Sequence, residues 1–282
     1  MAEGLEQGLS GRVVTVFAAK GGVGKTTLAV NLAVALAKLQ KEPVTLLDFD
    51  LELGVAAFFL GWEGKTSVID VVRSPEPPSV SMEWAMGESY GVRILAAPPT
   101  PDVAPEVEGD GKIDPDRNYV EEIIRAAQRQ SRWVVIDVGA NFREAAMTAL
   151  DLGRPVLLLT TGEVPTLRNT GRVLDILTTQ LRYDENNLRV ILSHCLQADR
   201  QKPQAVAAAL DFPVWREIPY DGAAAVEAAN TGVPVIVQRP RSPLARAVWD
   251  IARMLEAEAR EAEKERGRAE AEAATGTKER GQ

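Results

Sequence analysis

Short, continuously apolar runs recur along the chain and are separated by segments with helical spacing. The runs are rich in β-branched and aliphatic residues and do not alternate with polar positions, which is typical of strands buried on both faces of a parallel sheet. They cover Val13 to Ala18, Val44 to Phe49, Val92 to Ala96, Trp133 to Val138, Val156 to Thr161, Leu188 to Leu192 and Val214 to Ile218. Each run is predicted to be a strand of one sheet.

Amphipathic segments fill most of the intervals between these runs. Helices are predicted over Thr26 to Lys38, Tyr119 to Ser131, Phe142 to Leu150, Thr166 to Arg182 and Pro203 to Leu210. Because alternating strands and helices require right-handed crossovers, the sequence predicts an α/β fold with a doubly wound, mostly parallel sheet and helices on both faces. The Pro-rich segments Ser74 to Val80 and Ala97 to Lys112 are predicted to be surface loops, since the strand pattern resumes after each. One domain, residues 12–255, is expected.

The two ends of the sequence differ in character from this domain. Residues 1–11 lack the basic and apolar regions of a signal peptide and are predicted to be a flexible N-terminus. From Glu256 onward the sequence holds eight acidic and six basic residues, with Ala as its largest apolar side chain. Residues 256–282 are therefore expected to form a solvated helix or a disordered tail with nothing to bury. No apolar run is long enough for a membrane helix.

Composition narrows the functional classes. The formal net charge of −8 argues against a general nucleic-acid binder, which would need clustered Lys and Arg. A single Cys195 excludes an internal disulfide and a single His194 excludes a multi-histidine zinc site, so a reducing cytoplasm is the expected compartment. Both residues follow an apolar run and are interpreted as the end of a buried strand.

Candidate chemistry begins with the segment "KGGVGKTT", which follows the first predicted strand and opens the first predicted helix. That context is the one in which a glycine-rich loop binds phosphate, because backbone N–H groups converge there at the positive end of a helix. The loop proper comprises Gly21, Gly22, Val23 and Gly24. Lys25 is expected to contact the β and γ phosphates, the Thr26 hydroxyl to bind Mg²⁺, and Thr27 to lie near the α phosphate.

Three acidic residues lie at the ends of predicted strands. Asp48 and Asp50 end the second run, where residues two apart point to the same side, and Asp137 ends "RWVVID". Ligands of open α/β sheets bind at the carboxyl ends of the strands, so these carboxylates suit a Mg²⁺ shell and an attacking water. Asp137 occupies the expected place of a Walker B carboxylate.

The phosphate loop departs from the ordinary pattern in having Ala19 in place of a glycine and a second lysine, Lys20. In this it resembles the deviant Walker A motif of the ParA/MinD superfamily of ATPases, which have the P-loop NTPase fold. The resemblance implies an ATP-dependent homodimer in which Lys20 reaches the partner's nucleotide. It also implies that Asp50 activates the attacking water and that Asp48 lies nearer the metal and the switch loop.

The resemblance extends over roughly residues 12 to 255. The segment from Glu217, "EIPYDGAAAVEAANTGVPV", is similar to the family's closing segment and makes Pro219 and Tyr220 candidate contacts of the adenine. Two departures concern the site. Ser193 stands where the family often has an Asn that reads the adenine, and Gly139 stands where a Pro-containing turn often follows the Walker B Asp.

Within the superfamily, "LDFDLELGVAAFFLG", "ILAAPPTPD" and "VPTLRNTGRVLDIL" most resemble the CpaE/TadZ branch of pilus-assembly proteins. The branch implies an ATPase that binds ATP and Mg²⁺, hydrolyses slowly, dimerises and positions a pilus or secretion assembly through protein partners. Such partners would recruit a cytoplasmic protein to the inner face of the membrane or to a cell pole. Members of this branch usually carry a receiver-like domain ahead of the ATPase domain.

Several alternatives remain open at this stage. A DNA-partitioning ParA would need a basic surface, but Arg239, Arg241 and Arg246 are interpreted as a solvated face. A MinD-type membrane cycler would need a terminal amphipathic helix with large apolar residues. Reductases and metal-cluster carriers need paired cysteines, whereas a metabolic synthetase would need a substrate pocket. A module that holds ATP without hydrolysing it is the fourth alternative.

Overall fold

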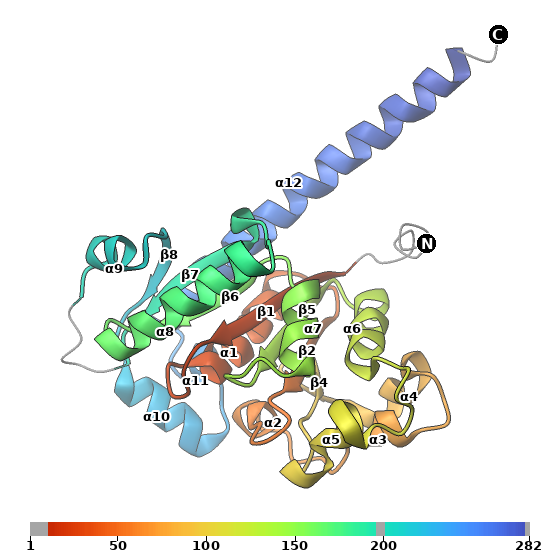
Figure 1. Ribbon diagram of the computed structural model, residues 1–282, viewed down its shortest axis with the longest axis horizontal. Coiled ribbons are helices and arrows are strands. Elements are labelled where there is room, and N and C mark those ends of the chain that lie inside the picture. The colour runs from red at the N-terminus through yellow and green to blue at the C-terminus, as the bar shows by residue number, and fades with distance from the viewer. Residues whose placement is uncertain (1–10, 196–200, 280–282) are drawn as a thin grey trace.

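An eight-stranded sheet forms the centre of the computed structural model, which describes residues 11–195 and 201–279 (Figure 1). The strands lie in the order β3-β4-β2-β5-β1-β6-β7-β8, and β3 alone among them is antiparallel to its neighbour. Their bounds are β1 Arg12–Ala18, β2 Val44–Phe49, β3 Gly87–Ser89, β4 Val92–Leu95, β5 Trp133–Val138, β6 Val156–Thr160, β7 Leu188–Ser193 and β8 Val214–Ile218. The predicted α/β fold, doubly wound with a mostly parallel sheet, is confirmed.

Helices cover both faces of this sheet and enclose two hydrophobic cores. One core contains residues of α3 Val68–Arg73, α4 Pro78–Ala85, α5 Ala104–Val107, α6 Tyr119–Gln130, α7 Glu144–Leu152, α8 Val164–Asp175 and α9 Pro203–Leu210. The other contains residues of α1 Lys25–Leu39, α2 Ala56–Phe59, α10 Gly222–Thr231, α11 Val235–Gln238 and α12 Pro243–Glu279.

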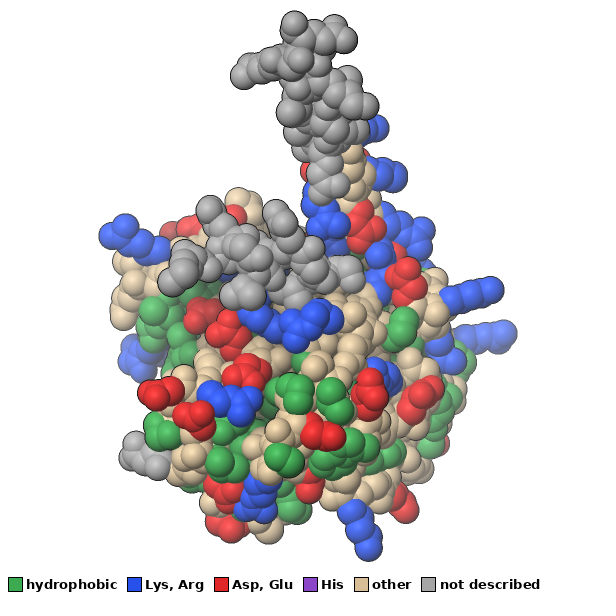
Figure 2. Space-filling view, turned by 90° about the vertical axis from the view of Figure 1, so that its right-hand side faces the viewer, with side chains coloured by type: hydrophobic (Ala, Val, Ile, Leu, Met, Phe, Trp, Pro, Cys, Tyr) green, Lys and Arg blue, Asp and Glu red, His purple; other side chains and the backbone are tan. Residues whose placement is uncertain are grey.

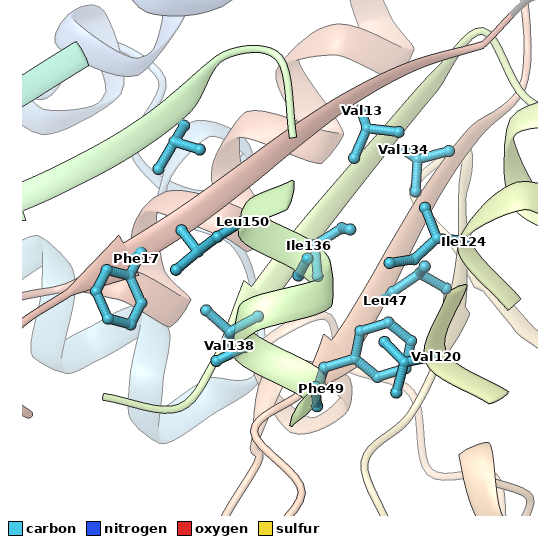
Figure 3. Packing of buried hydrophobic residues seen from close by; sticks show 14 of the residues in the cluster. Val13, Phe17, Leu47, Phe49, Val120, Ile124, Val134, Ile136, Val138 and Leu150 are labelled. Carbon is cyan, nitrogen blue, oxygen red and sulfur yellow. The ribbon is translucent and has the colours of Figure 1, made fainter. Parts of the chain in front are cut away.

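The strands supply both cores because successive side chains point to opposite faces. On β1, Val13 and Phe17 belong to one core, whereas Val14 and Val16 belong to the other. Figure 3 shows the first core, in which side chains of β1, β2 and β5 meet those of α6 and α7. All six residues of β2 and all six of β5 are buried, which explains why most of them are apolar.

The two Pro-rich segments predicted to be loops contain short helices. Pro78 is the first residue of α4, and Pro105 lies in the first turn of α5. Proline is compatible with a first helical turn because its missing N–H has no partner there in any case. The structure also adds β3, whose three residues are too few to give a pattern, and extends α8 by a π-helical turn, Ile176–Gln180.

The charged C-terminal segment continues α12 as one helix that extends away from the domain (Figure 1). Its described part mixes cations and anions (Figure 2). The expectation that nothing past Leu255 is buried was wrong for its first two turns. Ala259 is fully buried, and Glu256 accepts hydrogen bonds from the Trp133 indole at 2.9 Å and from Arg132 at 3.2 Å. None of the described helices has the length and apolar composition needed to cross a membrane.

Two truncations should separate the packed turns from the exposed part of the helix. Removing residues 257–282 deletes Ala259, whose carbonyl accepts from Arg12 at 2.7 Å, and Glu263, which pairs with Arg132 at 3.0 Å. We expect a loss of about 1 to 2 kcal/mol in the free energy of unfolding. Removing residues 268–282 should leave the melting temperature unchanged. Equal melting temperatures for both truncations would contradict the packing role.

Candidate nucleotide site

The predicted phosphate loop links the end of β1 to the first turn of α1. Gly22 and Gly24 have φ values of 79° and 94°, in the left-handed region that residues with a Cβ rarely adopt. Val23 between them is buried, which fixes the loop to the core, and α1 begins at Lys25. The loop therefore presents its backbone at the N-terminal end of a 15-residue helix, the arrangement that favours anions.

The two lysines of this loop face different surroundings. Lys25 is 9% exposed, and its charge lowers the pKa of Asp137, which places the ammonium group inside the site. Lys20 is exposed, and its Nζ lies 3.2 Å from Oε2 of Glu163, the residue before α8. The loop thus offers one cation inward and one outward.

Asp48 and Asp137 are paired positions on the neighbouring parallel strands β2 and β5, and both are 1% exposed. Burial and the negative charge of Asp137 hold the pKa of Asp48 well above its ordinary value. Burial also raises the pKa of Asp137 to about 6, although the Thr26 hydroxyl and Lys25 oppose the shift. The strand ends therefore place the carboxyl groups of Asp48 and Asp137 close together, an arrangement that a bound cation would stabilise.

The two carboxylates are satisfied differently. Neither oxygen of Asp137 has a partner at normal hydrogen-bond geometry among the described residues. Asp48 instead accepts from the backbone N–H of Ala56 at 2.9 Å and of Asp50 at 3.2 Å, so it anchors the loop after β2. Orphaned oxygens beside a threonine hydroxyl suit Mg²⁺, and Asp137 is the better placed of the two carboxylates predicted to bind the metal.

The fit to Mg²⁺ depends on phosphate. Within the described part of the chain, no group of three or more His, Cys, Asp or Glu residues could hold a metal ion. Thr26 and Asp137 together provide only part of an octahedral shell, and Mg²⁺ commonly completes such a shell with water and substrate phosphates. These residues are suited to the metal as part of a nucleotide complex.

Asp50 lies just past the end of β2 and next to the loop that follows β5. Its Oδ1 accepts from the Leu53 N–H at 3.4 Å. A Cβ built on Gly139 would lie 3.4 Å from the same oxygen and 2.7 Å from the amide nitrogen of Asn141. Glycine at position 139, a departure from the family pattern, thus lets the two loops approach each other at Asp50.

A cavity of about 240 Å³ continues from the phosphate loop. It is lined by Gly24 and Thr27 on one side and by the predicted base contacts Pro219 and Tyr220 on the other. Ser193 also lines it, at the position where the family often has Asn. The structure thus brings together the loop and the segment after β8, which are nearly 200 residues apart in the sequence.

The sequence interpretation missed several residues that line this cavity, among them His194, Cys195 and Leu244. His194 and Cys195 were assigned to a buried strand, but β7 ends at Ser193 and both line the cavity. His194 Nε2 lies 2.6 Å from Oε1 of Glu217. Leu244 of α12 lines the cavity as well. The position of His194 and Cys195 directly after a strand was a usable signal, because ligands bind beyond strand ends in such folds.

Asp137→Asn should stabilise the protein when nucleotide and metal are absent. The pKa of this carboxyl is raised from 3.8 to about 6, so ionisation above pH 6 destabilises the fold and the penalty disappears below the unfolded pKa. We expect a gain on the order of 2 kcal/mol at pH 8 and a smaller gain at pH 5. Thermal melts in EDTA measure it, with exposed Asp102→Asn as the control. A gain of the same size at both pH values would contradict the burial penalty.

Comparison with known proteins agrees with this geometry. Residues 14–235 match the family model described as the CobQ/CobB/MinD/ParA nucleotide binding domain. The septum site-determining protein MinD of Thermotoga maritima is 29% identical over 232 residues, which cover 80% of this chain and 81% of that protein.

Solved structures show the same architecture. The cell division ATPase MinD of Pyrococcus furiosus has a TM-score of 0.73 and 26% identity, and the match covers 87% of this chain and 98% of that one. MinD of Pyrococcus horikoshii, solved in complex with Mg-ADP, has a TM-score of 0.70 and 24% identity, with coverage of 86% and 95%. The chain therefore belongs to the CobQ/CobB/MinD/ParA nucleotide-binding family and is an ATPase of the ParA/MinD superfamily.

Proposed function

We propose that this ATPase is a nucleotide-switched dimer that positions or recruits a cellular assembly. The outward-facing Lys20 is the observation that carries the proposal. Its ammonium group stands at a cavity of about 270 Å³ lined also by Gly21, Gly22 and Glu163, at the mouth of the phosphate loop. A buried lysine already serves the loop from within, so Lys20 is available to a nucleotide bound by a second copy.

Different residues of one chain would bind the phosphates, the metal and the base and orient the attacking water. The loop amides and Lys25 would bind the phosphates, and Thr26 and Asp137 would hold Mg²⁺, which when bound offsets charge on the β and γ phosphates. Asp48 would act on the same region through the loop that it anchors, and its direct ligation of the metal stays a prediction. Pro219 and Tyr220 would contact the base, and Asp50 would orient the attacking water.

Asp50→Ala should keep ATP binding and lose most turnover, because a group that orients water affects the transition state more than the bound ground state. If hydrolysis ends the dimeric state, the variant should stay dimeric in ATP, whereas the wild type should return to monomer as ATP is consumed. Light scattering in ATP and in ADP measures this. A protein that stays monomeric in ATP would contradict the switch, and full turnover by the variant would contradict the role of Asp50.

Two cellular assemblies are candidates for the one that this ATPase positions. The sequence segments that resemble CpaE/TadZ favour a pilus or secretion assembly, recruited by protein partners at the membrane or a cell pole. The relatives named septum site-determining protein, from Thermotoga maritima at 29% identity and Escherichia coli at 28%, favour a septum-site function. Deleting the gene in its own host separates them, since the first predicts loss of pili or secretion and the second predicts misplaced septa.

A DNA-partitioning function has less support. Of the three arginines considered as a basic group, Arg239 is paired with Glu227. The remaining two cannot supply the set of phosphate contacts that DNA binding requires. We expect no retention on heparin at physiological salt.

A further inference from the structure

Arg143 joins the two loops that lie on either side of Asp50. Its guanidinium Nη1 lies 2.5 Å from Oε1 of Glu52, in the loop that follows β2. Its Nε lies 3.4 Å from Oε1 of Glu108, in the segment between α5 and α6. Arg143 itself directly precedes α7 and closes the loop that follows β5. Three separate segments therefore meet on one side chain.

The two ends of this connection are held with different firmness. Glu108 is 5% exposed, and its Oε2 accepts the Ala145 N–H in the first turn of α7. The backbone N–H of Arg143 donates to Oδ1 of Asn141 at 3.1 Å. Arg143 is thus fixed at the β5 side by a buried carboxylate and by its own backbone, whereas the side chain of Glu52 is about half exposed. The pair ties an exposed loop to a fixed point.

The tied loop carries Asp50. Glu52 follows Asp50 by two residues, and the loop closes on itself through the Gly54 N–H, which donates to the Asp50 carbonyl at 2.8 Å. On the other side, Gly139 lies beside the Asp50 carboxylate and precedes Arg143 by four residues. The Arg143–Glu52 ion pair therefore links the loop after β2 to the loop after β5 close to the Asp50 carboxylate, which is assigned to the attacking water.

We propose that Arg143 is a positioning residue for hydrolysis, which binds Glu52 and so holds the Asp50 loop against the loop after Asp137, with Glu108 fixing the guanidinium. The inference rests on the proposed role of Asp50. The half-exposed Arg143–Glu52 pair contributes little to stability, so the melting temperature should change little in Glu52→Gln. The rate should change more, because a displacement of about 1 Å in an orienting group can cost as much as a hundredfold.

The test compares Glu52→Gln, Arg143→Ala, Arg143→Lys and the double variant Glu52→Gln/Arg143→Ala. Glu52→Gln removes the charge from the exposed arm and so weakens that arm alone, leaving Glu108 paired, which keeps the test valid if Arg143→Ala folds poorly. Arg73→Ala is the matched control, since Arg73 forms a similarly exposed pair with Glu106 between α3 and α5. Each protein is assayed for ATP affinity by calorimetry, for kcat by phosphate release and for its melting temperature.

We expect kcat to fall about fivefold to tenfold in Glu52→Gln and in Arg143→Ala, with ATP affinity unchanged. The double variant should lose no more than the worse single variant, Arg143→Lys should recover part of the rate, and Arg73→Ala should match the wild type. Unchanged kcat in both single variants, or losses that multiply in the double variant, would overturn the proposed positioning role of Arg143. Asp50→Ala separates the role of Asp50 from that of Arg143. If Asp50→Ala is inactive while the single variants of Glu52 and Arg143 are normal, only the role of Arg143 is refuted. If Asp50→Ala is active, both roles are refuted.

Discussion

Lys25→Ala is expected to abolish ATP binding, with affinity falling by more than about a hundredfold, because a buried cation that faces phosphate is replaced by an apolar side chain. Lys25 is 9% exposed at the start of α1, so water could not readily substitute for its ammonium group. The backbone N–H groups of the loop would remain, but they carry no full charge.

Calorimetry with Mg-ATP measures this loss. Lys38→Ala is the matched control, since Lys38 is an exposed lysine in the last turn of the same helix. Lys25→Ala also removes a charge that lowers the pKa of Asp137, so the melting temperature of Lys25→Ala must be measured to show that it is folded. An affinity equal to that of the wild type in a folded variant would refute the phosphate-loop assignment.

Lys20→Ala should keep ATP binding but lose ATP-dependent dimerisation, with turnover falling by roughly 10³-fold, the value of a cation supplied in trans to phosphoryl transfer. The side chain is exposed and, among the residues that the structure describes, forms an ion pair with Glu163 of its own chain. Such a pair is weak in water, so exchange of Glu163 for a partner's phosphates is energetically accessible. Turnover that falls equally at all protein concentrations would instead indicate a role within one chain.

Mixing two inactive variants distinguishes action in trans from action in cis. A Lys20→Ala chain paired with an Asp50→Ala chain contains one complete site, because the intact Lys20 of one chain faces the intact Asp50 of the other. At equal concentrations up to about a quarter of the wild-type activity should return, since half of randomly formed dimers are mixed and each has one working site. If mixed dimers form and remain inactive, Lys20 does not act across the interface.

Much of the fold could be predicted because each signal was local. The seven apolar runs became β1, β2, β4, β5, β6, β7 and β8, since strands buried on both faces are mostly apolar. The exception is β8, of whose five residues only Ile218 is buried. The phosphate loop could also be predicted from a local signal, because Gly22 and Gly24 adopt backbone angles that residues other than glycine rarely adopt. The Pro-rich segments were misread, because a proline fits both a loop and the first turn of a helix.

The charged C-terminal segment shows where local patterns stop being sufficient. Its composition gave no reason to bury Glu256, yet the Trp133 indole and Arg132, more than 120 residues away, supply partners that make the burial favourable. The cavity beyond the phosphate loop is similar. Leu244 and His194 carry no motif and line that cavity only because β7 pairs with β8 and α12 packs against both β8 and α1.

The sequence by itself determined seven of the eight described strands, the phosphate loop and the three carboxylates at strand ends, because these depend on local backbone conformation and residue pattern. Tertiary structure decided how the carboxylates differ. Asp48 is satisfied by two backbone N–H groups, Asp137 has no partner at normal hydrogen-bond geometry among the described residues, and Asp50 meets the loop after β5. The donors to Asp48 are close in sequence, but the burial of each carboxylate depends on strands and loops that are distant in sequence, as in the pairing of Asp48 with Asp137.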